Sequence, residues 1–243
     1  MATVVIVHCA WWDSHLWQTV RHRLQAAGHE VLTPTLTGLG DRSHLCGLGH
    51  KQVDLSLHVE DILAVLEWED LHDVWLVGHS YSGMVATAVA DQVPERIAAV
   101  IYVDAFVPEN GQSMLDMLPP PARAGFEQQV RTLPDGRQVI PPRQFDYLGR
   151  RGEGSLSEDE IRRVLERGQS QPWATFTQPV HLTGAWARVP HTYIYCTDKG
   201  GLDALEEFAA RARARRDRVL ELSTGHFAML TAPNELADLL VAE

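Results

Sequence analysis

The chain has 243 residues, of which 45% are hydrophobic and 22% are charged, a composition that supports one large buried core and excludes a disordered chain. Its 32 acidic and 21 basic residues give a formal net charge of -11, which argues against nucleic acid or an anionic membrane as a partner. Cys9, Cys46 and Cys196 are few and lack C-x-x-C spacing, so they predict neither a disulfide framework nor a zinc site.

The chain begins with a β-branched run at residues 4–7, which predicts a strand because it is too short for a signal peptide and follows no basic residues. No apolar run approaches the ~20 residues that a membrane span requires. We therefore expect a cytoplasmic protein whose partner is a small-molecule substrate, and a homodimer is left open.

Short β-branched runs alternate with segments of helical period, which is typical of a parallel sheet with helices on both faces. A polar, glycine-rich loop is expected at residues 36–52, and Gly28 is placed to end the first helix. The expected strands are residues 4–7, 30–33, 74–77, 98–103, 191–196 and 218–222, and the expected helices lie around residues 16–24, 55–66, 84–90, 158–167, 202–209 and 233–241.

The alternation breaks after Asp104, where proline pairs and mixed helical pieces follow, and it resumes near residue 190. We therefore predict an α/β fold with a mostly parallel six-stranded sheet. Its core consists of residues 1–105 and 190–243. Residues 106–189 form a lid that is inserted after the fourth strand.

The stretch VGHSYSGM at residues 77–84 nearly matches the G-x-S-x-G elbow that presents a nucleophilic serine between a strand and a helix. Ser80 is the candidate nucleophile, and Gly78 supplies the first small residue that the tight turn requires. Ser82 replaces the second glycine as a small, tolerated residue beside Gly83. The alternative is a strand-to-helix turn without chemistry.

A serine hydroxyl becomes a good nucleophile only when a base removes its proton, so a histidine and an orienting acid are needed. Loops after parallel strands converge at the carboxyl edge of the sheet, which favours His226 and Asp198 after the last two strands. Asp104, at the end of an earlier strand, is the alternative acid or a hydrogen-bonding residue at the lid entry. His79 is interpreted as a packing residue. No H-x-H or H-E-x-x-H spacing occurs, so the sequence predicts no metal and no cofactor.

An oxyanion hole would take one backbone N–H from the residue after the nucleophile and one from the loop after an early strand. We assign these donors to Tyr81 and Ala10. The helix that starts at the elbow would add a favourable dipole.

The motifs HCAW, GHSYSG, TD and TGH together resemble the α/β-hydrolase family, in the branch of small bacterial esterases, plant methylesterases and hydroxynitrile lyases. The resemblance covers nearly the whole chain, including TLTGLGDRSH at 35–44, VPERIAAVIYVDAFVPENGQS at 93–113 and TFTQPV at 175–180. It implies the α/β-hydrolase fold, whose triad runs in the order serine, acid, histidine, as Ser80, Asp198 and His226 do.

Two residues depart from that branch. Cys9 stands where its esterases usually carry glycine, so its side chain is expected beside the oxyanion hole, as an apolar filler or as a group that tunes the reaction. Phe227 stands where hydroxynitrile lyases carry a lysine after the histidine, and an apolar ring cannot stabilise departing cyanide. Relatives of the fold that use an aspartate nucleophile are set apart by Ser80.

Aromatic and apolar side chains in the lid and in the loop after the first strand are expected to line a pocket for a small apolar or aromatic substrate, with ordinary packing as their alternative role. The expected pocket residues are Cys9, Trp12, Trp173, Trp186 and Phe227.

The sequence thus predicts a serine hydrolase that cleaves a carboxylic ester through an acyl-enzyme. Two other functions stay open at this point. One is a tailoring enzyme for a specialised metabolite that uses the same triad for lactone, thioester or methyl-ester hydrolysis, or for lyase or cyclase chemistry. The other is a non-catalytic protein that binds a small ligand on a hydrolase scaffold.

Overall fold

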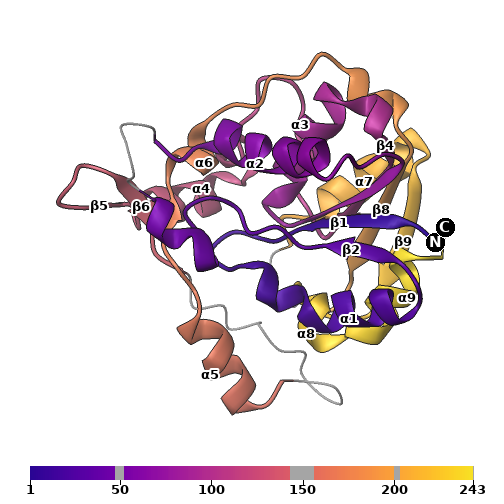
Figure 1. Cartoon of the computed structure of the whole chain (residues 1–243). Helices are drawn as coiled ribbons and strands as arrows, with labels where there is room; N and C mark the ends of the chain where they lie inside the picture. The colour runs from indigo at the N-terminus through magenta and orange to yellow at the C-terminus, as the bar shows by residue number, and fades with distance from the viewer. Residues whose placement is uncertain (47–51, 143–155, 200–202, 243) are drawn as a thin grey trace.

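A six-stranded parallel sheet runs through the computed structural model, which describes residues 1–46, 52–142, 156–199 and 203–242 (Figure 1). All five neighbouring strand pairs are parallel, as the sequence predicts. In their order across the sheet the strands are β2 (Glu30–Leu32), β1 (Thr3–Val7), β3 (Val74–His79), β4 (Ile97–Val103), β8 (His191–Cys196) and β9 (Arg218–Leu222).

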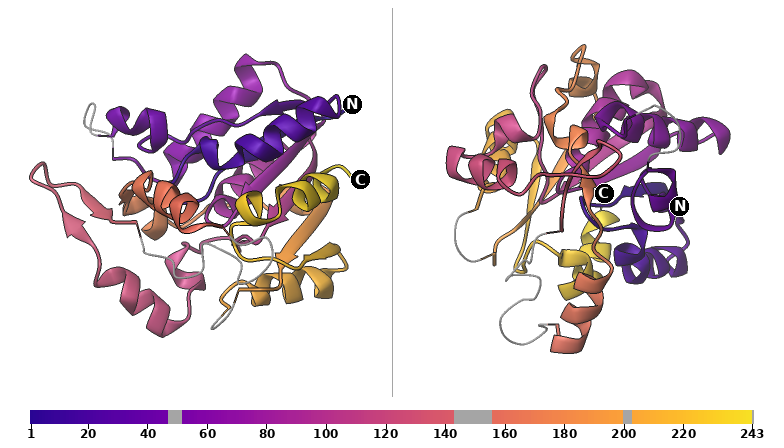
Figure 2. Two further views of the ribbon diagram at one scale, coloured as in Figure 1. Left: turned by 90° about the horizontal axis from the view of Figure 1, so that it is seen from below. Right: turned by 90° about the vertical axis from the view of Figure 1, so that its left-hand side faces the viewer.

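Helices cover both faces of this sheet. Connections between parallel strands are right-handed, so the direction of a connection across the sheet decides which face its helix covers. The helices whose connections run toward β9 share one face of the sheet. The connection from β1 to β2 runs the other way, so its helix, α1, lies on the opposite face together with α9 (Figures 1 and 2). The helices are α1 (Gln18–Ala26), α2 (Leu55–Trp68), α3 (Ser82–Gln92), α4 (Pro120–Glu127), α5 (Glu158–Glu166), α6 (Ala174–Thr177), α7 (Glu206–Arg215), α8 (Ala228–Thr231) and α9 (Pro233–Leu240), with 3₁₀ turns η1 (Ser14–Trp17), η2 (Gly40–Leu45), η3 (Pro94–Arg96), η4 (Leu115–Met117) and η5 (Ala185–Arg188).

The central strands are apolar along their whole length because both of their faces are covered. Every residue from Val4 to Val7 is buried, and so is every residue of β4 from Ala99 to Val103. Local signals set the ends of the helices. The Asp54 carboxylate accepts the Leu57 N–H at the start of α2, and Gly28, with φ at 89°, follows the end of α1.

The segment between β4 and β8 carries a second, antiparallel sheet of three short strands, β5 (Arg131–Thr132), β6 (Gln138–Ile140) and β7 (Gln171–Pro172). With α4 and α6, this sheet lies beyond the carboxyl ends of the large sheet's strands, on the side away from the two termini (Figures 1 and 2). Residues 143–155 of the expected lid lie outside the described residues. The division into a core and a lid over 106–189 stays a prediction.

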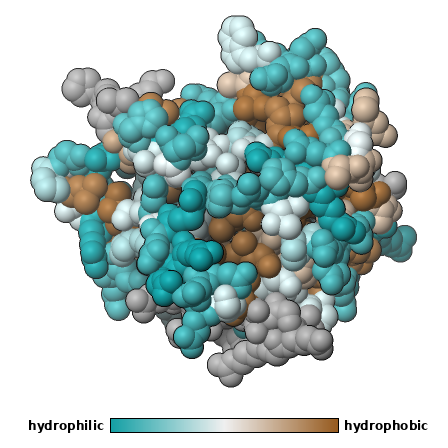
Figure 3. Space-filling model, turned by 60° about the horizontal axis from the view of Figure 1, so that its bottom comes forward, coloured by the Kyte–Doolittle hydropathy of each residue, from teal (hydrophilic) through white to brown (hydrophobic). Residues whose placement is uncertain are grey.

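The expected strands agree closely with those observed, and the two C-terminal ones begin and end at the predicted residues. The expected loop at 36–52 contains η2, and its residues 47–51 lie outside the described residues. Among the described helices, none is both long and apolar enough to cross a membrane. The cytoplasmic location stays a prediction. On the face shown in Figure 3, hydrophobic residues gather in separate patches bordered by hydrophilic ones.

Two fully buried histidines, His8 after β1 and His58 in α2, hold the loop that follows β2. His8 accepts the Leu36 N–H at Nε2, over 3.0 Å, and its Nδ1 lies 2.8 Å from the carbonyl oxygen of Cys9. His58 Nε2 lies 2.9 Å from the carbonyl oxygen of Thr37. Burial disfavours the charged imidazolium and lowers the pKa of each histidine from 6.5 to about 4.

These pKa values predict that the protein loses stability as the pH falls. Below pH 6.5 the unfolded chain takes up protons that folded His8 and His58 refuse until about pH 4, so the free energy of unfolding decreases over that interval. Between pH 7.5 and pH 5 the expected loss is about 2 kcal/mol for each histidine. Urea unfolding at the two pH values measures it. His58→Gln should reduce the loss, whereas a change at exposed His22, His22→Gln, should not. An undiminished loss in His58→Gln would contradict the assignment.

Candidate active site

The loops after β1, β3, β4, β8 and β9 meet at the carboxyl edge of the sheet. Strand order reverses between β1 and β3, and ligands of open α/β sheets bind in the crevice at such a point. Ala10 follows β1 and Ser80 follows β3, on either side of the reversal. Asp104 and His226 follow β4 and β9 at the same edge.

Ser80 occupies a strained turn between β3 and α3. Its φ of 56° lies in the left-handed region, which is uncommon for a residue with a side chain. The turn is held by the Ser80 N–H, which donates to the carbonyl of Val103 over 3.3 Å, and by the Ser80 carbonyl, which accepts from the N–H groups of Gly83 and Phe106 at 3.1 Å each. Ser80 is half-buried, so its side chain is partly accessible at the edge of the sheet.

The residues around the turn must be small because backbones approach closely. A Cβ atom on Gly78 would lie 2.8 Å from the Ser82 carbonyl oxygen, and one on Gly83 would overlap the carbonyl oxygen of Phe106. Ser82 does more than fit: its buried hydroxyl donates a hydrogen bond to the carbonyl of His8. The serine that replaces the second glycine of the motif therefore connects the start of α3 to the loop after β1.

The imidazole of His226 is paired with Asp104. Its Nδ1 lies 2.6 Å from Asp104 Oδ2, and the Asp104 side chain has no solvent exposure. Asp198, the acid expected from the sequence, is exposed, and its N–H donates to the carbonyl of Thr224. The structure therefore corrects the expected pairing: the alternative carboxylate, Asp104, contacts the histidine.

Strand register explains this difference. Asp104 directly follows Val103, whose register partners are His79 on β3 and Ile194 on β8, so Asp104 emerges between two strands. Its φ of 43° turns the chain there, and its N–H donates to the Ile194 carbonyl over 2.8 Å. Asp198 lies two residues beyond the end of β8, where the chain is exposed to solvent.

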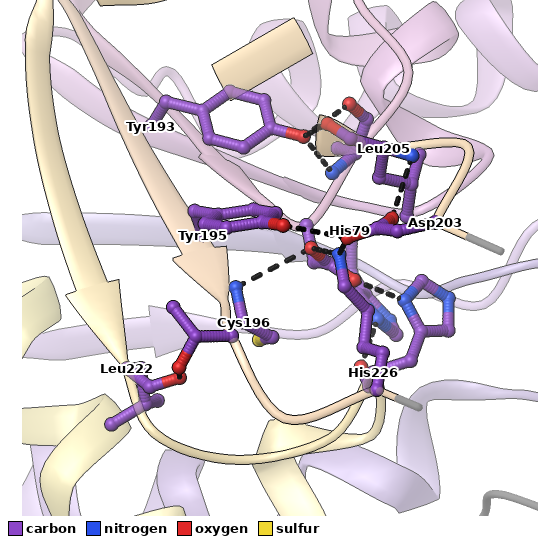
Figure 4. Close-up of polar contacts among 12 residues, drawn as sticks. His79, Tyr193, Tyr195, Cys196, Asp203, Leu205, Leu222 and His226 are labelled. Carbon is purple, nitrogen blue, oxygen red and sulfur yellow. Dashed lines mark hydrogen bonds and ion pairs between the residues drawn. The ribbon is translucent and has the colours of Figure 1, made fainter. Parts of the chain in front are cut away.

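The second oxygen of Asp104 is paired with Lys199. Figure 4 shows the neighbouring contact between Tyr195 and Asp203, together with His226. Lys199 Nζ lies 2.6 Å from Asp104 Oδ1 and 2.7 Å from Asp203 Oδ2, and the lysine side chain is only 11% exposed. The Tyr195 hydroxyl also donates to Asp203, over 2.7 Å. Burial alone would raise the pKa of Asp203, but the bonds from Lys199 and Tyr195 hold that pKa below its usual value. Both oxygens of the buried carboxylate thus have charged or polar partners.

His79 contacts both the ring and the backbone carbonyl of His226. The sequence predicts only a packing role for His79, so this contact is an additional finding. The His79 ring is fully buried, its centroid lies 4.7 Å from that of His226, and its Nε2 lies 2.9 Å from the His226 carbonyl oxygen. Burial holds the pKa of His79 well below 6.5, so the ring is neutral and can donate to that carbonyl. The signal in the sequence for this contact is the position of His79, which directly precedes Ser80 in the G-x-S-x-G-like motif.

The expected oxyanion residues lie on facing loops at the crevice. Among the described residues, the N–H groups of Ala10 and Tyr81 take part in none of the turn, loop or cap hydrogen bonds, whereas the next N–H along, that of Trp11, donates to Gln171. Tyr81 is also the residue that precedes α3, so its N–H lies at the positive end of the helix dipole. The oxyanion role of Ala10 and Tyr81 stays a prediction of the sequence.

Cys9 is buried in the loop between His8 and Ala10, with 3% exposure. Burial raises the pKa of its thiol, so the sulfur is protonated at neutral pH and is a weak nucleophile. This environment fits the expected role of a small apolar filler beside the oxyanion site.

One of the expected pocket residues, Phe227, contacts the His226 ring edge to face, with centroids 5.4 Å apart. Trp12 in turn contacts Phe227, with ring centroids 5.2 Å apart. Trp173 contacts Phe176, with ring centroids 6.2 Å apart. That Cys9, Trp12, Trp173 and Phe227 line a substrate pocket stays a prediction.

Trp186 lies at the opposite edge of the sheet. The Trp186 ring contacts the ring of His191, the first residue of β8, with centroids 4.8 Å apart, and the Trp186 backbone N–H donates to the Asp91 carboxylate near the end of α3. Ser80 lies at the end of β3 and the start of α3, so the length of these elements separates the two residues. The structure therefore corrects the expectation that Trp186 borders the substrate.

Within the described ranges, no group of three or more His, Cys, Asp or Glu side chains is placed to hold a metal ion. The arrangement at the sheet edge instead combines a serine in a strained turn, a histidine paired with a buried carboxylate, and two backbone N–H groups. Such an arrangement can activate a hydroxyl and stabilise a negatively charged oxygen.

Removing the cation behind Asp104 should destabilise the fold. Lys199→Met leaves a buried carboxylate without its charged partner, so we expect the free energy of unfolding to decrease by about 3 kcal/mol. Urea unfolding at pH 7.5 measures the change. Arg23→Met, which breaks the exposed pair with Asp238, is the control and should cost less than about 1 kcal/mol. Equal effects of the two substitutions would contradict the structural role of Lys199.

Comparison with known proteins finds esterases among the relatives of this chain. A relative from Nocardioides sp. (strain SG-4G), the carbendazim hydrolyzing esterase, is 36% identical over 252 residues, with 100% of this chain and 99% of the relative covered. Polyneuridine aldehyde esterase from Rauvolfia serpentina is 23% identical over 252 residues, with 98% and 93% covered. Both relatives are esterases, the enzyme class that the sequence predicts for this chain.

A solved structure shares the fold. An extracellular alpha/beta-hydrolase from a Paenibacillus species superimposes with a TM-score of 0.81 at 24% identity, over 99% of this chain and 98% of the other. Residues 4–239 match the family described as "Alpha/beta hydrolase family". Since this match spans nearly the whole chain and a full-length relative is 36% identical, the chain belongs to the alpha/beta hydrolase family.

Proposed function

We propose that the protein is a serine esterase that hydrolyses small apolar or aromatic esters through an acyl-enzyme. Ser80 is the nucleophile, His226 is the general base and acid, and Asp104 orients His226. The N–H groups of Ala10 and Tyr81 hold the oxyanion. The observation that carries this proposal is the 2.6 Å pair between His226 Nδ1 and the buried Asp104 carboxylate, at the same sheet edge as the strained Ser80 turn.

In the first half of the reaction, His226 Nε2 takes the proton of the Ser80 hydroxyl while the oxygen attacks the ester carbonyl carbon. The carbonyl π electrons move to its oxygen, where two backbone N–H groups and the start of α3 stabilise the charge. When the tetrahedral intermediate collapses, the bond to the alkoxy group breaks, and that group leaves as an alcohol with the proton from His226.

In the second half, His226 removes a proton from water, and the resulting hydroxide attacks the acyl carbon. Collapse of this intermediate breaks the bond to Ser80 Oγ, which regains its proton, and the carboxylic acid is released. The Asp104 carboxylate stabilises the imidazolium that forms twice in the cycle. Lys199 is paired with the other oxygen of Asp104.

The substrate class follows from the aromatic surroundings of the site. Phe227 contacts His226, Trp12 contacts Phe227, and the ring of Tyr81, an expected oxyanion donor, contacts Phe176 at 5.5 Å. The relative that hydrolyses carbendazim, at 36% identity over the whole chain, supports a flat aromatic group in the substrate. A panel of acetyl, butyryl and benzoyl aryl esters together with carbendazim would rank the acyl and leaving groups.

Substitutions of the serine and of the two aspartates test the assignment. Ser80→Ala should lower ester turnover on the order of 10⁶-fold. Asp104→Asn should lower kcat by roughly 10⁴-fold because the amide favours the wrong tautomer of His226. Asp198→Asn is the matched control, since that side chain is exposed, and its kcat should stay within about threefold of the parent. Steady-state kinetics on an aryl ester measure all three.

The outcomes separate the alternatives. Full turnover in Ser80→Ala would exclude the serine mechanism. A large loss in Asp198→Asn with little loss in Asp104→Asn would show that a different carboxylate orients His226 during catalysis. Circular dichroism of each variant verifies that it is folded.

A further inference from the structure

Trp11, the residue after the expected oxyanion donor Ala10, has a strained backbone. Its φ of 67° lies in the left-handed region, where a residue with a Cβ atom is less stable by about 1–3 kcal/mol. The Trp11 conformation sets the path that the chain takes directly after Ala10, whose N–H is an expected oxyanion donor. Something in the fold must therefore hold Trp11 in place.

Hydrogen bonds from a distant segment hold it. The Trp11 N–H donates to Gln171 Oε1 over 2.9 Å, and the Trp11 carbonyl accepts from the N–H of Gln169 over 2.7 Å. The indole Nε1 donates to the carbonyl of Ile140 over 3.1 Å. These partners belong to β6, to β7 and to the residues just before β7, about 130 to 160 positions later in the sequence.

The Gln171 side chain is itself fixed. It has no solvent exposure, and its Nε2 donates to the hydroxyl of Thr175 over 2.8 Å, while that hydroxyl donates to the Pro172 carbonyl over 2.7 Å. On the strand, Gln171 pairs with Ile140. The glutamine oxygen that accepts the Trp11 N–H is therefore held by both its backbone and its amide group.

The same segment also reaches the other expected oxyanion residue. Burial raises the pKa of the Tyr81 phenol, so the hydroxyl stays protonated at neutral pH. The phenol oxygen also lies 3.0 Å from His58 Nδ1, and the Tyr81 ring contacts Phe176 at 5.5 Å. The segment that carries Gln171, which holds one loop of the expected oxyanion site, thus also contacts, through Phe176, the residue that forms the other loop.

We propose that Gln171 is a positioning residue for the oxyanion hole: it holds Trp11 in the left-handed conformation that aims the Ala10 N–H at the reacting carbonyl oxygen. The proposal rests on the proposed esterase function. Gln171 acts through the backbone and does not itself touch the substrate.

The effect of losing this contact follows from hydrogen-bond geometry. Without the Gln171 oxygen, the buried Trp11 N–H loses the acceptor seen in the structure, and the loop can relax toward a conformation that relieves the positive φ. Oxyanion donors act at 2.7–3.1 Å from the charged oxygen, and the loss of one costs about 10²–10³-fold in turnover. Because the charge develops only in the transition state, kcat should fall while KM changes little.

The test replaces Gln171 with an unbranched residue of similar length that has no acceptor. In Gln171→Met, kcat per active site, counted by titration with a fluorophosphonate, should fall roughly 10²-fold, with KM within about threefold of the parent. The affinity for a phenylboronic acid, which forms a tetrahedral adduct with a reactive serine, should fall by a similar factor. Counting active sites removes the contribution of unfolded protein.

Gln178 provides a matched control. Its side chain makes the same pair of bonds, accepting from the Ser56 N–H over 2.8 Å and donating to the Ser56 hydroxyl over 2.9 Å, but at the start of α2. Gln178→Met should leave kcat per active site within about twofold of the parent.

Two results would overturn the proposal: a kcat per active site in Gln171→Met within twofold of the parent, or a rise in KM at constant kcat. If Gln171→Met does not fold, Thr175→Val tests the proposal instead, because it removes the acceptor of the Gln171 amide while the side-chain volume is kept. In Thr175→Val, kcat should fall roughly tenfold. An unchanged kcat in that variant would contradict the inference. Ester turnover in Ser80→Ala would instead overturn the proposed function, so the two failures are distinguishable.

Discussion

The pairing of a fully buried carboxylate organises this site. Asp104 has no solvent exposure, and a buried charge is tolerated only where partners compensate for the lost water. His226 occupies one oxygen and Lys199 the other, each at 2.6 Å. The two partners come from the loops after β9 and β8, so one requirement of charge pairing draws three strand ends together and fixes where the imidazole lies.

The opposite wall of the site is assembled from segments that are distant in the sequence. Ser82 connects α3 to the His8 carbonyl, and Gln171 holds the backbone of Trp11. The loop after β1 is therefore bonded both to the helix that follows the nucleophile and to the small sheet of β5, β6 and β7. The segment between β4 and β8 therefore also holds the backbone of the loop after β1.

The sequence predicts the sheet well because hydrophobic runs and turn residues are local signals, and the limits of β8 and β9 agree with the structure. It does not distinguish Asp104 from Asp198, because both follow strands and only the register shows which carboxylate enters the interior. Gln171 has no recognisable motif, since its role depends on a contact with Trp11 across 160 positions. The position of Trp186 likewise depends on packing against α3 and β8 rather than on any local pattern.

The central claim is that Ser80 is an activated nucleophile. The most direct measurement is to treat the native protein with a fluorophosphonate probe and to locate the adduct by mass spectrometry of its peptides. We expect one adduct, on Ser80, that forms at neutral pH and is absent when the protein is first unfolded in urea. A native protein that forms no adduct, or one that is labelled only at another residue such as Cys9, would contradict the role of Ser80.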